Sequence, residues 1–144
     1  MRPPADPPAA LRQAYAEAWY RVDAAPTPFR LQPGQPCAAL HALYRERGAK
    51  CALFISACNP FSRLCSEQVN AAAQQRLRAV LKQESDCVLE AVGGDPAGEW
   101  PDEPAFLALG LARERGLALG RAFDQYAVLW AGADAVPWLS WCFP

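Results

Sequence analysis

The feature that most constrains the fold is a continuous apolar run at residues 51–57, with the sequence Cys-Ala-Leu-Phe-Ile-Ser-Ala. The run has the length of a strand, and its residues do not alternate between apolar and polar types. A strand with one face in water shows that alternation, so this pattern predicts a strand that is covered on both faces. Such a strand lies inside a sheet, and other elements must pack on both sides of it. The chain therefore needs a central sheet.

Weaker signals on either side of this run predict the remaining elements. Strands are predicted at residues 20–22, 29–31, 87–92, 105–111, 126–131 and 136–144. Helices are predicted after Asp6, where Leu11, Tyr15 and Trp19 form an apolar stripe, and at residues 37–47, 66–83 and 112–123. The order does not alternate cleanly enough for a doubly wound sheet. It predicts an α+β fold with a single mixed or mostly antiparallel central sheet of about five to seven strands and about four helices packed on it.

Single residues add local detail to this prediction. Pro28 cannot donate to a strand ladder, so the short strand after it is placed at a sheet edge, as is the C-terminal strand. Gly48 is expected to end the second helix. Gly116 and Gly120 lie on one side of the last helix and allow close approach to a neighbour. Val69 is assigned to the buried stripe of the third helix.

The length of 144 residues indicates one domain. A chain of this size buries about 68–70% of the surface that its unfolded form exposes, so it needs no disulfide or metal for stability. No linker or repeat divides the sequence, and we predict a flexible N-terminal tail at residues 1–8 and a single α+β domain at 9–144. No stretch approaches a secretory signal or the roughly 20 apolar residues of a membrane span. We therefore predict a cytoplasmic protein with no membrane partner.

The charged residues argue against nucleic acid as a partner. The chain carries 14 lysines and arginines against 15 aspartates and glutamates, which gives a net charge of −1. The basic residues are scattered along the sequence, whereas a nucleic-acid-binding protein concentrates them on one face or one segment. No nucleic-acid partner is predicted.

The six cysteines contain no C-x-x-C pair, which argues against a zinc ribbon or a thioredoxin-like site. They are Cys37, Cys51, Cys58, Cys65, Cys87 and Cys142. Free cysteine is often buried, so we expect reduced thiols that pack as small apolar groups. Thiol-based redox or metal handling is a less favoured interpretation that requires two sulfurs within bonding reach. His41 is the only histidine, and neither a metal site nor a cofactor is predicted.

The segment 58–65, between the central strand and the third helix, is the first candidate site. Asn59 precedes a proline and marks a turn, and Ser62 follows in the same loop. Ligand sites gather where strands end and helix N-termini point, because unpaired backbone N–H groups attract anions there. Asn70 lies on the inward face of the helix. These three polar side chains either bind a ligand or hold the loop and the helix together.

Glu103 is the second candidate, because it lies close to Trp100 and just before a predicted strand. Partial burial raises the proton affinity of a carboxylate, so Glu103 is the predicted catalytic acid or base and Trp100 a ligand-binding residue. The alternative is a solvated loop charge next to a tryptophan that covers the core. Gln125, at the end of the last helix, is a third candidate, which either meets a ligand or caps carbonyl groups.

These clusters together carry a resemblance to a known family. The chain resembles the bacterial family called domain of unknown function 3293 over about residues 11–130, in the segments Phe54-Ile55-Ser56-Ala57-Cys58-Asn59-Pro60-Phe61-Ser62, Asn70, Trp100-Pro101-Asp102-Glu103-Pro104, Leu109-Gly110-Leu111 and Phe123-Asp124-Gln125-Tyr126-Ala127. The family usually has an aromatic residue where this chain has Cys58. The resemblance implies a small bacterial protein without an established activity, whose signature positions include Asn59, Pro60, Asn70, Trp100, Glu103 and Gln125.

Two functions from different classes follow. The first is a small-molecule binding protein with a polar pocket, which extends to a hydrolase-like acid–base enzyme if Glu103 transfers protons. The second is a non-catalytic interaction or regulatory module that uses the aromatic C-terminal segment 130–143 as a patch for a partner or for a second copy in a homodimer. The residue pattern names neither the ligand nor the partner.

Overall fold

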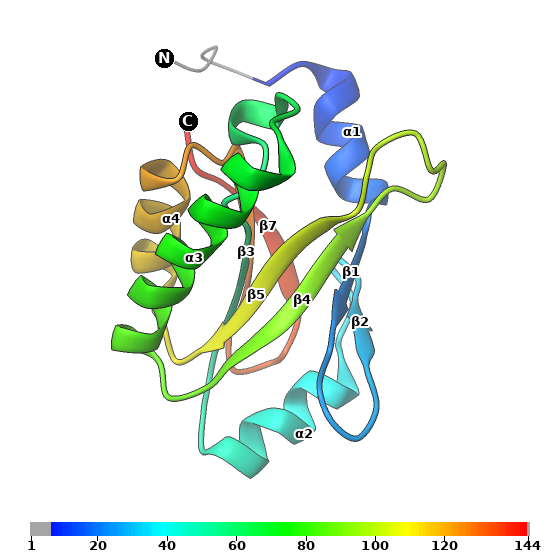
Figure 1. Ribbon diagram of the computed structural model, residues 1–144. Helices are drawn as coiled ribbons and strands as arrows, with labels where there is room; N and C mark the ends of the chain where they lie inside the picture. Colours follow the sequence, from blue (N-terminus) through cyan, green and yellow to red (C-terminus); the bar gives the residue numbers. More distant parts are fainter. Residues whose placement is uncertain (1–6, 144) are drawn as a thin grey trace.

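The computed structural model describes residues 7–143 and has the predicted α+β fold, with a curled sheet and helices packed on it (Figure 1). In chain order the elements are α1 (Ala9–Glu17), β1 (Trp19–Val22), β2 (Phe29–Leu31), α2 (Ala38–Arg47), β3 (Ala52–Ile55), the 3-10 turn η1 (Pro60–Ser62), α3 (Glu67–Glu84), β4 (Val88–Gly94), β5 (Glu103–Leu109), α4 (Arg113–Ala122), β6 (Ala127–Ala131) and β7 (Pro137–Trp141). No helix within this range is long and apolar enough to cross a membrane.

The sheet is antiparallel throughout and has the strand order β2-β1-β4-β5-β3-β6-β7. All residues of β3 are buried, and the strand lies between β5 and β6. This confirms the central strand that the apolar run predicts. The strands β2 and β7 form the two edges, as the proline content of their surroundings indicates.

The two faces of the sheet have separate cores, because successive strand residues point to opposite sides. On one face Leu53 and Phe106 pack with α3 and α4, which lie side by side in Figure 1. On the other face Phe54 and Leu107 belong to a core that includes Leu40 of α2. The helices α1 and α2 lie at opposite ends of the sheet (Figure 1). The second face is the inner side of the curl, and it carries the candidate site.

Close packing of α4 explains its two glycines. A Cβ atom on Gly116 would lie 2.7 Å from Cδ1 of Leu53, and one on Gly120 would overlap Sγ of Cys142. The predicted close approach is therefore confirmed for both positions. Gly48 follows α2 in the left-handed conformation, with φ of 68°, which confirms it as the helix end.

Three local predictions are corrected. The first helix ends at Glu17, so Trp19 belongs to β1 rather than to the helical stripe. Val69 lies on the first turn of α3 with 55% of its surface exposed, because the buried stripe of this helix begins one turn later, at Ala73. The strand β5 begins at Glu103 and not at Ala105, since Glu103 pairs with Gly93.

The N-terminal predictions fall mostly outside the described residues. Asp6, after which the first helix is predicted, lies outside them, and so do residues 1–6 of the predicted flexible tail. In the structure α1 begins at Ala9, with Pro8 at the capping position. The single domain at 9–144 stays a prediction.

Candidate functional site

The loop after β3 has an unusual backbone. Asn59, Phe61 and Ser62 have φ values of 48°, 51° and 57°, in the left-handed region that residues other than glycine seldom enter. The surrounding structure holds this conformation: the Phe61 N–H donates to the Asp124 carbonyl at 2.7 Å, and the Phe61 ring packs against Tyr126 at 5.5 Å between ring centroids. Such strained segments persist only where many contacts hold them, and they concentrate at functional sites.

Asn59 and Asn70 tie this loop to α3 through reciprocal hydrogen bonds. The Asn59 N–H donates to Oδ1 of Asn70 at 2.9 Å, and Nδ2 of Asn70 donates back to Oδ1 of Asn59 at 2.9 Å. The Cys65 N–H donates to the same Oδ1 at 2.9 Å. Only 5% of Asn59 is exposed. The two amides therefore fix the start of α3 against the end of β3.

The remaining donor of Asn59 reaches Glu103. Nδ2 of Asn59 donates to Oε2 of Glu103 at 3.1 Å, and Nε1 of Trp100 donates to the same oxygen at 2.6 Å. No described residue donates to Oε1 of Glu103. Every fully buried side-chain oxygen in the described range has a partner, so Oε1 is not fully buried. Burial raises the pKa of Glu103, and the hydrogen bonds from Trp100 and Asn59 oppose this rise.

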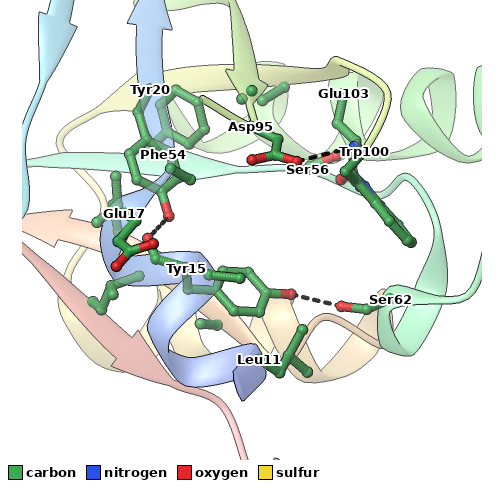
Figure 2. A pocket seen from close by; sticks show the side chains of 18 of the residues that line it. Leu11, Tyr15, Glu17, Tyr20, Phe54, Ser56, Ser62, Asp95, Trp100 and Glu103 are labelled. Carbon is green, nitrogen blue, oxygen red and sulfur yellow. Dashed lines mark hydrogen bonds between the residues drawn. The ribbon is translucent and has the colours of Figure 1, made fainter. Parts of the chain in front are cut away.

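Glu103 lines a cavity of about 630 Å³ on the inner face of the sheet. The sheet contributes apolar side chains to the lining, among them Phe54 and Leu129, and α1 contributes Tyr15. Figure 2 shows Tyr15, Phe54 and Glu103 on different sides of this space. Its volume is within the range of small-molecule sites, which are about 300–1,000 Å³ and mainly apolar with a few polar groups.

Tyr15 closes the cavity from the side of α1. Its hydroxyl and the Ser62 hydroxyl form a hydrogen bond of 3.0 Å (Figure 2). Burial raises the pKa of Tyr15 to about 12, so the phenol stays protonated at neutral pH. The Tyr20 hydroxyl donates to the Tyr15 carbonyl at 2.5 Å, which holds the end of α1 against β1.

The structure brings four of the six predicted site residues to the cavity wall: Ser62, Trp100, Glu103 and Gln125. Gln125 donates through Nε2 to the carbonyls of Cys58 and Phe123, both at 3.1 Å. Asn59 and Asn70 are not part of the lining, and their amides are engaged with the loop, α3 and Glu103. The ligand-binding and catalytic roles of all six stay predictions.

Sequence reasoning missed several lining residues. Tyr15 and Tyr20 were visible only as helix-stripe and strand residues, and nothing in the sequence indicated that they approach Ser62 and Glu103. Asp95 had a clearer signal, since an aspartate before Pro-Ala-Gly is typical of a turn. Its carboxylate accepts the N–H groups of Ala97, Glu99 and Trp100 at 3.0 Å each, so it shapes the loop that carries Trp100.

Comparison with known proteins identifies the family. The family model described as "Protein of unknown function (DUF3293)" matches residues 55–128, about half of the chain. The chain belongs to the DUF3293 family. The match includes the loop after β3, Trp100, Glu103 and Gln125, whereas α1 and β1 precede it. Searches of curated proteins and of solved structures found no match.

The cysteines of this family member contribute no activated thiol to the cavity. The six are free, and Cys58, Cys87 and Cys142 are buried. Burial raises the pKa of Cys58, whose Sγ contacts the Pro104 carbonyl at 3.6 Å. Within residues 7–143, no group of three histidine, cysteine or acidic side chains is arranged to hold a metal ion.

The C-terminal aromatic residues are mostly packed within the domain. Trp141 contacts Tyr15 edge to face, with 5.4 Å between ring centroids, and Phe143 contacts Phe61 at 5.7 Å. Nε1 of Trp130 donates to the Leu111 carbonyl at 2.9 Å. Trp138 differs, because 58% of its surface is exposed at the edge strand β7.

Proposed function

We propose that the chain binds a small, mainly apolar molecule in the cavity and that Glu103 is the acid–base group of a hydrolase-like reaction there. One observation carries this proposal. Both hydrogen bonds to the Glu103 carboxylate end on Oε2, which leaves Oε1 without a described donor at a cavity whose wall is otherwise mainly apolar. A general acid or base needs such an atom, within hydrogen-bond reach of the bound substrate.

The environment of Glu103 suits proton transfer. A pKa raised by burial brings the carboxyl nearer to neutral pH, where a group can both accept and release a proton. Asn59 and Trp100 hold the carboxylate in one orientation. The hydroxyl groups of Tyr15 and Ser62 are available to orient a polar group of the substrate. A covalent route through Cys58 is less favoured, because burial raises the pKa of its thiol.

Ligand binding is tested first by thermal shift against nucleotides, sugars, amino acids and other small metabolites. A compound that binds only the folded state raises the melting temperature. We expect at least one compound to stabilise the wild type and Asp102→Asn, which removes a neighbouring exposed carboxylate outside the cavity. The shift is expected to fall in Glu103→Gln. An equal shift in Glu103→Gln, or no shift with any compound, contradicts the proposal.

Turnover is tested with a compound that binds. Its conversion is followed by NMR in the wild type and in Glu103→Gln. Loss of a general acid or base lowers the rate by about 10²–10⁴-fold, and we expect a loss of this size in Glu103→Gln. The control Asp102→Asn is expected to keep both the binding and the turnover of the wild type. Unchanged turnover in Glu103→Gln contradicts the proposal that Glu103 is the acid–base group.

The second candidate function, an interaction or regulatory module, is supported by Trp138 alone. Exposed tryptophans are frequent anchors at protein interfaces. Sedimentation of the wild type and of Trp138→Ser tests it in the form of a homodimer. Self-association that disappears in Trp138→Ser supports this function, and a monomer at all concentrations removes the homodimer.

A further inference from the structure

The charged side chains that line the cavity all have one sign. Glu17, Asp95, Glu99 and Glu103 contribute carboxylates to the lining, and no lysine, arginine or histidine lines it among residues 7–143. Glu17 and Glu99 are exposed, whereas Glu103 is half-buried. Clefts lined by one sign of charge concentrate ligands of the opposite sign, since their low-dielectric walls focus the field. The carboxylates of the lining therefore favour a positively charged ligand in the cavity.

The hydrogen-bonding atoms of the lining point to the same class. The lining donors are already engaged: Trp100 Nε1 with Glu103, both N–H groups of Gln125 with carbonyls, and the Tyr20 hydroxyl with the Tyr15 carbonyl. Acceptors without a described donor include Oε1 of Glu103 and Oε1 of Gln125, and the exposed carboxylates of Glu17 and Glu99 add further acceptors. A ligand that satisfies them must therefore donate hydrogen bonds.

The side chains of the lining offer few free hydrogen-bond donors to a ligand that accepts hydrogen bonds. The Ser56 hydroxyl donates to the Pro104 carbonyl at 2.8 Å, and it is used in this way before any ligand arrives. The hydroxyls of Tyr15 and Ser62 use one of their two hydrogens in the bond between them, which leaves one hydroxyl hydrogen for a ligand. An anionic ligand would be repelled by the carboxylates of the lining and would find only this one side-chain hydroxyl as a donor.

Aromatic rings complete the lining. Tyr15, Tyr20, Phe54 and Trp100 surround the cavity, and Figure 2 shows Trp100 and Tyr15 on either side of the space near Glu103. Cations are attracted to the faces of such rings, by about 0.5–2 kcal/mol, and a desolvated site gives the larger value. Rings together with a carboxylate favour a cation over a neutral donor such as an alcohol.

We infer that the ligand is an organic cation, a primary or secondary amine whose ammonium group binds Oε1 of Glu103 and whose apolar body lies on the inner face of the sheet. This inference rests on the proposed function and gives the class of its ligand. An ammonium group supplies several N–H donors from one point, so it reaches Glu103 and still has a donor for Gln125 or for Ser62. Hydrogen bonds to charged partners are the stronger ones.

The test uses matched amines, alcohols and carboxylates on the same body: 2-phenylethylamine with 2-phenylethanol and 3-phenylpropionate, then the corresponding hexyl and cyclohexylethyl compounds. Dissociation constants are measured by titration calorimetry at neutral pH. We expect each amine to bind at least about tenfold more tightly than its alcohol, a ratio that corresponds to about 1.4 kcal/mol, and each carboxylate to bind most weakly. Glu103→Gln is expected to bring the amine-to-alcohol ratio close to one, and Asp102→Asn to leave it unchanged.

The outcomes separate this inference from the proposed function. Alcohols that bind as tightly as amines overturn the organic cation and leave the small-molecule site in place. Amine binding that persists in folded Glu103→Gln, as judged by its circular dichroism, also overturns the inference, because the amines then bind elsewhere. No binding by any compound of the three bodies overturns the inference, and the proposed function is overturned as well only if the thermal-shift screen also finds no ligand.

Discussion

The hydrogen bonds of Asn59 allow the most detailed prediction. Asn59→Gly removes the side chain but keeps a residue that adopts the left-handed backbone at φ of 48° without steric cost. The lost amide accepts hydrogen bonds from the Cys65 N–H and from Asn70 Nδ2, and it donates to Oε2 of Glu103. The variant therefore removes the side-chain links of the loop to α3 and to Glu103 in one step, while the backbone N–H of residue 59 can still donate to Asn70.

The expected loss of stability follows from the bonds. A hydrogen bond contributes about 1 kcal/mol net, and a buried group left without a partner costs about 1–3 kcal/mol. With three bonds lost at a residue that is 5% exposed, we expect Asn59→Gly to lower the free energy of unfolding by about 3 kcal/mol. Asn59→Ala loses the same bonds and also places a Cβ atom in the left-handed region, which costs about 1–2 kcal/mol more.

Urea denaturation measures both differences, and a double-mutant cycle isolates the pair. Asn59→Gly, Asn70→Ala and the double variant are expected to give a coupling energy of about 1–2 kcal/mol, within the usual range for residues in one hydrogen-bond network. The matched control is Gln13 with Glu17, an exposed bond of 2.9 Å within α1, where we expect about 0.2–0.5 kcal/mol. Coupling at Asn59 no larger than in this control, or Asn59→Ala as stable as Asn59→Gly, refutes the reasoning.

Three further predictions concern other parts of the domain. The pKa of Glu103 is raised in the folded state, so its contribution to stability is present below the ordinary pKa of 4.5 and is lost as the pH rises through the raised pKa. The wild type therefore loses stability over this window and Glu103→Gln does not, which urea denaturation from acidic to neutral pH measures. Gly120→Ala is expected to lose about 1–3 kcal/mol in the same assay because its Cβ overlaps Cys142, whereas Gly93→Ala, which meets no atom within 4 Å, changes stability by less than about 1 kcal/mol. Titration with a thiol reagent is expected to label the exposed Cys65 rapidly, and rapid labelling of the buried thiols in the folded protein contradicts the packing. The buried thiols are Cys58, Cys87 and Cys142.

Patterns with a strong local cause were predictable from the sequence. The apolar run at 51–57 predicted β3 correctly because a strand covered on both faces cannot alternate. The helix predicted at residues 66–83 starts where a serine can cap it, and Ser66 caps α3 by accepting the Val69 N–H at 3.2 Å. The boundary between α1 and β1 was wrong because Trp19 continues the helical spacing while its backbone already pairs with Gly94. Periodicity cannot detect where tertiary pairing begins.

The candidate site was predictable only in part, for a similar reason. Asn59, Trp100 and Glu103 belong to short motifs, and each motif marks a turn or a strand start that can be recognised locally. Their meeting depends on the register of β3 with β5, which brings residues 44 positions apart into one hydrogen bond. Tyr15 approaches Ser62 from the other end of the cavity across 47 positions. No local pattern encodes either distance.

The backbone of the loop after β3 is another feature that depends on contacts between residues far apart in the sequence. Phe61 and Ser62 occupy a conformation that costs a residue with a Cβ atom about 1–2 kcal/mol, and glycine at either position would relieve the strain. Glycine would also remove the ring that packs between Tyr126 and Phe143, and the hydroxyl that bonds to Tyr15. Ser62 lines the cavity, and the Phe61 ring holds the loop against Tyr126 and Phe143. The contacts of these two side chains therefore account for the departure from local backbone preference at this place.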